Sequence, residues 1–432
     1  MQSLLAVGLV ATCAACQAVG AGERVPSAAA PHAAAAPSEL NDAPGPSAGP
    51  TVVWIGGDVL LSGAIRRSVR RHGDPARGFA QLLEPVAGVW RAEGDGAFVL
   101  LNLESPVARE VRNGNDDFLR SKRGAARVPT PLNAPPWVLD GLQRAGVDGV
   151  MLANNHALDQ GREGLAETID AAHAAGLVVT GAGRAPHLGW PVVVGEGGAT
   201  TAILSYFEKD FPEPSLPTGE AGLSVLGPHA VDDVRAAARS SAAVLVVVHV
   251  VAELLAEPKP AWRTWARDFA EAGAAGVFFH GTHVPGPVET MHAHGREVVV
   301  AFGLGNSVSD MGARASPARD DAGPHGKWDL AAARSGLLAR VEVRDGVTRV
   351  GFLPVWMGDD RYLVRNGVAS REVITFALHP LGPCGPAHAL PSWPEPQRRE
   401  MERWLDGRRE ELLAASGLRA HGCERLLRSA GH

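Results

Sequence analysis

The chain has 432 residues, a formal net charge of −6 and a pI near 6.2, and charged residues make up 20% of it. It offers no basic field for a nucleic-acid backbone, and no stretch combines Lys and Arg with stacking aromatics, which excludes nucleic acid as a partner. The length allows two or three domains, or one large α/β domain with additions.

Residues 1–16 read MQSLLAVGLVATCAAC, a short apolar stretch in which Cys13 and Cys16 follow small and aliphatic residues. The stretch is too short to span a bilayer and is typical of a secretory signal or a bacterial lipoprotein cleavage site. In the second case the thiol of Cys13 or Cys16 would be acylated after export. The alternative is a buried or disordered apolar N-terminus of a cytosolic protein. We expect an exported protein of the cell envelope, either a membrane-anchored lipoprotein or a periplasmic or extracellular protein.

Ala, Pro and Gly dominate residues 17–50, which lack apolar periodicity and therefore predict an extended linker. Such a linker would lift a folded domain off a surface. Two further cysteines, Cys384 and Cys423, lie near the other end of the chain. They could form a disulfide if the protein is exported, and they are two free thiols if it is not.

From Thr51 onward, apolar runs alternate with amphipathic segments. Strands are predicted at 52–56, 97–103, 149–153, 177–181, 201–207, 243–250, 276–281 and 298–303. Helices are predicted within 78–94, 136–146, 161–176, 230–242 and 262–273. This alternation indicates an α/β protein that contains parallel strands.

A β-hairpin is predicted at residues 336–357, with Asp345 and Gly346 at its tip, because Asp-Gly suits a two-residue turn. One amphipathic helix is predicted within 393–417. We therefore divide the folded part into a main domain, 51–357, and a C-terminal extension with a helix, 358–432.

Polar residues stand at or just after the ends of most of the predicted strands. In an open α/β sheet, ligands bind outside the carboxyl ends of the strands, so we expect these side chains to converge on one edge. They are Asp58, Asn102, Glu104, Asn155, His156, His249, His280, His283 and Asn306.

The chemistry of this set is that of a metal site. Carboxylate, amide and imidazole ligands without cysteine suit a divalent metal such as Mn, Fe or Zn. Two ions that share a carboxylate would activate water and stabilise a phosphoryl or acyl transition state. His156 could instead donate a proton to a leaving group. The alternatives are that Asn155 and His156 form a turn or a helix cap, and that His249 is a core histidine with satisfied hydrogen bonds.

Several motifs occur in a characteristic order. They are GDVLL, LNLESPV, ANNHALDQGREGLAETI followed by GAG at 181–183, His249 with Glu253, HGTHVPGPVE and FGLGN. In these motifs the chain resembles the CapA family, often called poly-γ-glutamate capsule biosynthesis proteins, which is similar to the calcineurin-like metallophosphoesterases. The resemblance runs from about Val52 to about Met357.

The resemblance implies a metallophosphoesterase-like αββα sandwich, in which two mixed sheets are flanked by helices and the strand ends form a dimetal cleft. It places Asp58 among the metal ligands and Glu104 where the superfamily has a bridging aspartate. Asn155 would ligate the second metal, and His249 and His283 would be the later imidazole ligands.

The chain also departs from the pattern. Leu60 stands where phosphoesterases have a ligand histidine, although the CapA family usually has an apolar residue there. The usual His-Trp-Gly is HVV, and the usual Gly-x-His-Pro-His is FHGTH. Gly281 therefore occupies a ligand position and His280 lies one place earlier, which is either a compensating shift or a lost ligand.

These observations predict a CapA-like protein of capsule or poly-γ-glutamate biosynthesis with a metal-dependent hydrolase or transferase site at the cell envelope. By the resemblance, His156 would be the catalytic acid. The substrate would be an envelope polymer or a phosphorylated compound, and the partners a membrane biosynthesis complex. The alternatives are a non-catalytic envelope scaffold or polymer-binding lipoprotein with a degenerate metal site, and a cytosolic phosphatase. An Arg-rich insertion, 109–127, would either attract an acidic polymer or form a solvated loop.

Overall fold

The computed structural model describes residues 49–94, 96–111, 132–188, 190–209, 216–317, 330–369, 375–381, 393–419 and 428–429. All of these belong to one of the two compact units of the chain, Glu39–His432. The predictions for the four cysteines, for nearly all of the linker and for most of the Arg-rich insertion lie outside the described residues.

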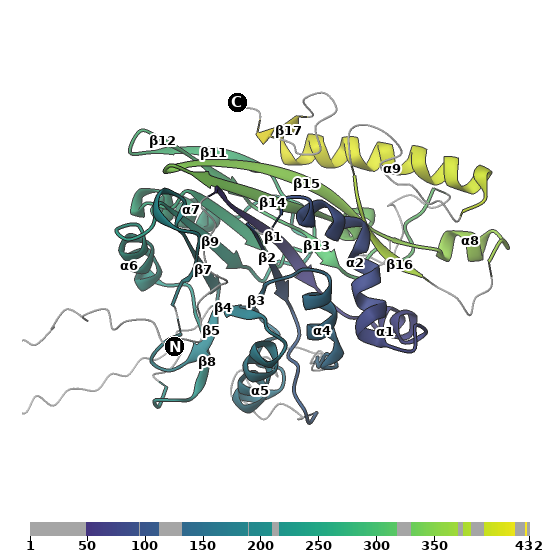
Figure 1. Ribbon diagram of the computed structural model, residues 1–432. Coiled ribbons are helices and arrows are strands. Elements are labelled where there is room, and N and C mark those ends of the chain that lie inside the picture. The colour runs from purple at the N-terminus through teal and green to yellow at the C-terminus, as the bar shows by residue number, and fades with distance from the viewer. Residues whose placement is uncertain are drawn as a thin grey trace, which may run out of the picture. The chain divides into compact units, whose positions relative to one another are not determined.

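The larger of two main sheets contains eight strands, in the order β16-β15-β14-β1-β2-β3-β4, with β13 beside β1 (Figure 1). Neighbouring strands from β1 to β4 are parallel, whereas β14, β15 and β16 are antiparallel to their neighbours. The strands are β1 Thr51–Val59, β2 Ala97–Leu103, β3 Gly149–Met151, β4 Val178–Thr180, β13 Asn306–Val308, β14 Ser335–Arg344, β15 Val347–Asp359 and β16 Phe376–Pro380.

The second sheet has six strands in the order β11-β12-β10-β9-β7-β6, parallel except for β6 and β11. They are β6 Val192–Val194, β7 Thr201–Phe207, β9 Ala243–His249, β10 Gly276–His280, β11 Val288–Ala293 and β12 Arg296–Ala301. Two short pairs complete the described strands: β5 Ala182–Arg184 with β8 Ala221–Leu223, and β17 Leu418–Arg419 with β18 Arg428–Ser429.

Side chains on a strand point alternately to its two faces, so each sheet has a hydrophobic layer on either side. In β1, Val52 and Trp54 pack with the helices on one side, and Val53 and Ile55 face the second sheet. The helices on the first side are α1 Gly63–Arg70, α2 Pro75–Arg91, α4 Trp137–Arg144 and α5 Gly161–Ala174. The outer face of the second sheet is covered by α6 Pro228–Ala237 and α7 Pro260–Ala272. The predicted αββα sandwich of mixed sheets is therefore confirmed.

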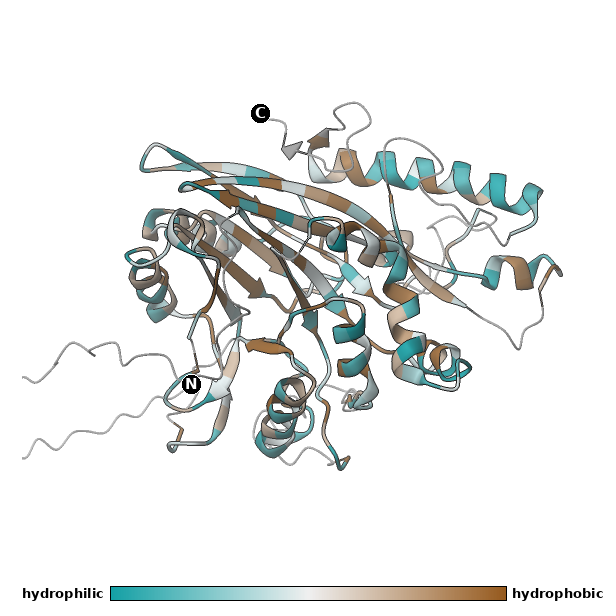
Figure 2. Ribbon diagram, in the orientation of Figure 1, coloured by the Kyte–Doolittle hydropathy of each residue, from teal (hydrophilic) through white to brown (hydrophobic). Residues whose placement is uncertain are grey.

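Local chemistry accounts for these elements. Strand β9, AVLVVVH, is buried along its whole length, and a continuous run of β-branched residues is expected where a parallel strand is covered on both faces. Figure 2 shows the same hydrophobic character in the strands of both sheets, in contrast to the mostly hydrophilic α9 Glu395–Ser416. The N-cap of α2 is Asp74, whose side chain accepts hydrogen bonds from the N–H groups of Ala76 and Arg77.

All eight predicted strands and all the predicted helices are present, although several are displaced or shortened at their ends. The predicted hairpin is also present. Asp345 and Gly346 have φ values of 51° and 75°, and a type I′ turn requires positive φ at both positions. From the predicted C-terminal extension, β16 pairs with β15, and α8 Arg361–Arg365 precedes it. Within the described ranges, no helix combines the length and apolar character that crossing a membrane requires.

Candidate metal centre

The ends of strands from both sheets meet at one place. Side chains alternate between the two faces of a strand. On this pattern Asn102 in β2, His249 in β9 and His280 in β10 each lie on the face that points toward the other sheet. In β1 one extra residue relative to β2 shifts the register between Ile55 and Asp58, so that Asp58 pairs with Asn102. Because of this bulge, the Asp58 side chain joins the same group.

Most of the polar residues predicted at strand ends are brought together and buried. The buried members are Asp58, Asn102, Glu104, His249, His280, His283 and Asn306. Asn155 and His156 are partly exposed beside them, and Glu253 is exposed, although its charge still acts on Glu104 and His283.

Asp58 is held by groups on both of its carboxylate oxygens. Oδ1 accepts a hydrogen bond from Asn102 Nδ2 at 2.8 Å and lies 3.1 Å from His280 Nδ1. Oδ2 accepts from the Gly281 N–H at 3.1 Å and lies 3.1 Å from His283 Nδ1. Burial alone would raise the pKa of Asp58, but the hydrogen bonds with His280 and His283 outweigh it and hold that pKa well below its ordinary value. Asp58 is therefore ionised.

Glu104 is buried, and neither of its carboxylate oxygens has a hydrogen-bond partner among the described residues. Its Oε1 lies 3.7 Å from Nε2 of His249 and 3.7 Å from Nε2 of His283. Burial raises the pKa of Glu104 well above its ordinary value, against the opposing positive charge of His283. A buried carboxylate without donors is costly unless it is neutralised, so this site fits a bound cation.

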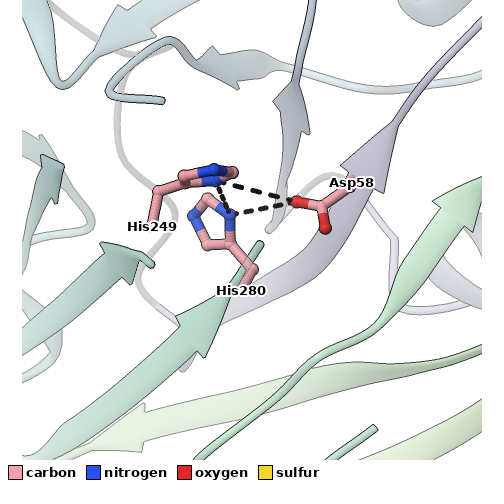
Figure 3. Close-up of side chains that lie close together, drawn as sticks. All are labelled: Asp58, His249 and His280. Atoms are coloured by element: carbon pink, nitrogen blue, oxygen red, sulfur yellow. Dashed lines mark hydrogen bonds and ion pairs between the residues drawn. The ribbon is translucent and has the colours of Figure 1, made fainter. Parts of the chain in front are cut away.

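The imidazoles of the cluster lie at the distances expected for neighbouring ligands. His249 Nδ1 is 3.0 Å from His280 Nδ1, and both face Asp58 (Figure 3). Burial and the neighbouring His280 lower the pKa of His249 well below its ordinary value, which keeps it in the neutral form that binds metals.

The pKa of His283 shifts in the opposite direction to that of His249. Burial would lower its pKa, but the negative charges of Glu104 and Asp58 raise it to about 10. Because a histidine binds a metal only in its neutral form, a cation bound at His283 would compete with this proton. Among the described residues, two groups are close enough to hold an ion: Asp58 with His249 and His280, and Asp58 with Glu104 and His283.

His156 lies at the edge of this cluster. Its Nδ1 is 2.8 Å from Asp159 Oδ2, and its side chain keeps 16% of its surface exposed. Asp159 is fixed in turn by the N–H of Leu132, which donates to the same oxygen at 2.8 Å. The imidazole is thus held at one nitrogen, while its other nitrogen is available for proton transfer.

Two residues of the same loop were missed by the sequence analysis. Asp159 fixes His156, and its spacing three residues after the histidine was the available signal. Asn154 donates from Nδ2 to Asn102 Oδ1 at 3.1 Å and to the Leu103 carbonyl at 3.0 Å, and its Oδ1 accepts from the His156 N–H. Asn154 therefore connects the turn that carries His156 to the residues around Asp58.

Gly281 cannot be replaced by a residue with a side chain without local displacement. Its φ is +91°, and an added Cβ would lie 2.2 Å from the Val250 carbonyl oxygen and 2.8 Å from His249 Nε2. The position where the resemblance implies an imidazole thus has no room for one. His280, one residue earlier, instead points toward Asp58 and His249 (Figure 3).

A cavity of about 320 Å³ lies elsewhere, between β15, β16, α8 and α9. Aromatic side chains that include Trp356, Trp393 and Trp404 line it. None of the polar strand-end residues does, so the candidate site is the strand-end cluster and not this cavity.

Comparison with known proteins agrees with this placement. The sequence profile of the family described as "Bacterial capsule synthesis protein PGA_cap" matches residues 52–311, a range that contains every member of the cluster. The chain is also 24% identical over 265 residues to the "PGA biosynthesis protein CapA" of Bacillus subtilis (strain 168). That alignment covers 59% of this chain and 62% of the relative, so the chain spans less than two thirds of the relative's length.

Proposed function

The chain belongs to the PGA_cap family of bacterial capsule synthesis proteins, and we propose that its strand-end cluster is a metal-dependent hydrolase or transferase site that acts in capsule biosynthesis. The observation that carries this proposal is the buried carboxylate of Glu104. It has no hydrogen-bond donor among the residues that the structure describes, and it lies 3.7 Å from the Nε2 atoms of two imidazoles. A purely structural core would not leave such a group unpaired.

The residues that would hold a metal are Asp58, Glu104, His249 and His283, with Asn155 beside His249 at 2.8 Å. Bound Mn, Fe or Zn would lower the pKa of a water molecule and stabilise negative charge on a phosphoryl or acyl group. Oxygen and nitrogen ligands without sulfur suit these metals.

His156 would donate a proton to the departing group. The Asp159 carboxylate accepts from His156 Nδ1–H, which leaves Nε2 as the nitrogen that carries the transferred proton. The buried position of the carboxylates excludes bulk water from one side of the cluster, which strengthens its electrostatic effect on a bound substrate.

The proposed substrate is an envelope polymer or a phosphorylated compound. The name of the Bacillus relative, which refers to PGA biosynthesis, supports a role in making a polymer. Export, a lipid anchor on Cys13 or Cys16 and assembly into a membrane biosynthesis complex belong to the same proposal. Mass spectrometry of the mature N-terminus tests the anchor, because acylation changes its mass by a fixed amount.

The catalytic proposal is tested with protein that has been stripped of metal and reloaded with Mn, Fe or Zn. A chromogenic phosphodiester serves as the probe, and wild-type protein is compared with His156→Ala. We expect metal-dependent turnover that falls by about 100-fold or more in the variant. Turnover that is indifferent to metal, or equal in both proteins, would contradict the proposal.

A second function is favoured by two departures from the family pattern. Gly281 has no side chain, and the sequence HVV begins at His249, the last residue of β9. These departures suit a non-catalytic envelope scaffold that keeps the fold and binds polymer. A scaffold of this kind would show no metal-dependent rise in melting temperature, whereas a ligand that binds only the folded state must raise it.

A further inference from the structure

His280 and His249 end two neighbouring parallel strands and are paired in register. Both side chains are buried, at 0% and 1% exposure. His280 Nδ1 lies 3.0 Å from His249 Nδ1 and 3.1 Å from Asp58 Oδ1, and the third side of this triangle, from His249 Nδ1 to Asp58 Oδ1, is 4.0 Å (Figure 3). Three ligand atoms that each lie about 2.0–2.2 Å from one ion are separated by roughly 3–4 Å, so this spacing fits a common cation.

The hydrogen bond between His249 and Asn155 leaves Nδ1 of His249 as the nitrogen that can bind a cation. Its Nε2 lies 2.8 Å from Asn155 Oδ1, an acceptor, so the proton of the neutral ring belongs on Nε2. The lone pair is then on Nδ1, which faces His280 and Asp58. Metal-bound histidines commonly donate their other N–H to an acceptor in this way.

The opposite arrangement holds at His283. Asn306 Nδ2 donates to the carbonyl oxygens of His283 and Ala333, which turns Asn306 Oδ1 toward His283 Nδ1 at 3.1 Å. The Nδ1–H of His283 therefore points toward two acceptors at 3.1 Å, Asn306 Oδ1 and Asp58 Oδ2, and Nε2 is left facing Glu104. His249 and His283 thus direct their lone pairs to two different places.

Asp58 lies between these two places. Its Oδ1 faces His249 and His280, and its Oδ2 is on the side of His283 and Gly281. Asn102 supports the carboxylate through Nδ2, and Asn154 fixes the orientation of Asn102 by donating to its Oδ1. Hydrogen bonds of this kind to a ligating carboxylate are typical of the residues around a metal site.

We propose that the cluster has two cation positions that share Asp58, and that His280 supplies the imidazole for one of them in place of the side chain that Gly281 lacks. One position is formed by Asp58 Oδ1, His249 Nδ1 and His280 Nδ1, and the other by the Asp58 carboxylate, Glu104 and His283. This assignment rests on the proposed metal centre. It differs from the arrangement implied by the resemblance, because Asp58 takes the bridging place of Glu104 and Asn155 orients His249.

The test is the number of ions that each chain retains. Wild-type protein, His280→Ala and His283→Ala are loaded with Mn²⁺ or Zn²⁺, dialysed, and measured by elemental analysis. We expect two ions per chain in the wild type and one in each variant. His292→Ala, which removes an exposed imidazole from β11, is the matched control and should keep both ions.

Circular dichroism and the melting temperature show whether each variant folds. If His280→Ala does not, His280→Gln carries the test, since it retains a polar side chain in the buried position. Two ions retained in the His280 variant, or a single ion in the wild type, would overturn the two-position assignment and leave the proposed function standing. No ion in the wild type would overturn the metal centre itself.

Discussion

His249 and His280, the last residues of two neighbouring parallel strands, place their Nδ1 atoms 3.0 Å apart in the buried layer between the sheets. Two imidazoles without an intervening cation gain little from such an approach, since only one hydrogen bond can form between them. Asp58 lies within 4.0 Å of both nitrogens and supplies the negative charge that a cation site needs. This relationship links the fold to the proposed chemistry.

We predict that Gly281 cannot be replaced by alanine without a loss of stability. Gly281→Ala should destabilise the protein by about 1–3 kcal/mol, because φ is +91° and the new Cβ would meet the Val250 carbonyl oxygen at 2.2 Å. The added Cβ would also crowd His249 Nε2, so metal binding should weaken. Urea unfolding measures the first effect and metal titration the second.

Gly295→Ala is the control for this variant. Gly295 also has positive φ, +71°, but an added Cβ there meets nothing within 4 Å. It should cost only about 1 kcal/mol, the backbone strain alone, and leave metal affinity unchanged. Equal losses of stability and affinity in the two variants would show that the contact with Val250 and His249 is not the cause.

The carboxylate of Asp159 is predicted to position His156. Asp159→Ala should reduce kcat of the metal-loaded protein by about 10- to 100-fold with little change in KM, because His156 loses the partner of its Nδ1. Combined with His156→Ala, it should add no further loss, since both act through one imidazole. Steady-state kinetics of the single and double variants check this, and additive losses would rule out the shared role.

Much of this site could be predicted from sequence because polar residues follow apolar runs. Parallel strands bring their carboxyl ends to one edge, so the sequence alone indicated Asp58, Glu104 and His249 as neighbours. What it could not give was the direction of side chains after the strands end. The bulge in β1 and the positive φ of Gly281 are backbone features that depend on long-range packing.

The same limit explains the short elements that were missed. Strands such as β5, β6 and β8 have three residues each, too few to show a period. The role of Asn154 was also missed, because its partners, Asn102 and the Leu103 carbonyl, are more than 50 positions away in the chain. A contact of that kind is created by strand pairing and leaves no local pattern.

A pH-dependent effect on stability is predicted at Asp148, which directly precedes β3. Burial raises the pKa of Asp148 to about 6, against the hydrogen bond from the Val99 N–H at 2.8 Å. A carboxyl group with a raised folded-state pKa favours the folded state below its unfolded pKa, near 4, and loses that contribution as pH rises through about 6.

Asp148→Asn should therefore stabilise the protein at pH 8 by about 1–3 kcal/mol relative to the wild type, and this gain should vanish near pH 4. The amide oxygen can still accept from Val99, so the hydrogen bond is retained. Urea unfolding of both proteins at the two pH values makes the comparison. A difference in stability that does not change with pH would contradict the assigned burial effect.

The most direct test of the metal centre is elemental analysis of the purified protein, with Glu104→Ala measured beside the wild type. Removing the buried carboxylate takes away the negative charge that lies between His249 and His283. We expect bound Mn, Fe or Zn in the wild type, and a clear loss of metal in a folded Glu104→Ala variant. A wild-type protein that retains no metal after loading, or a variant that retains as much as the wild type, would contradict the account.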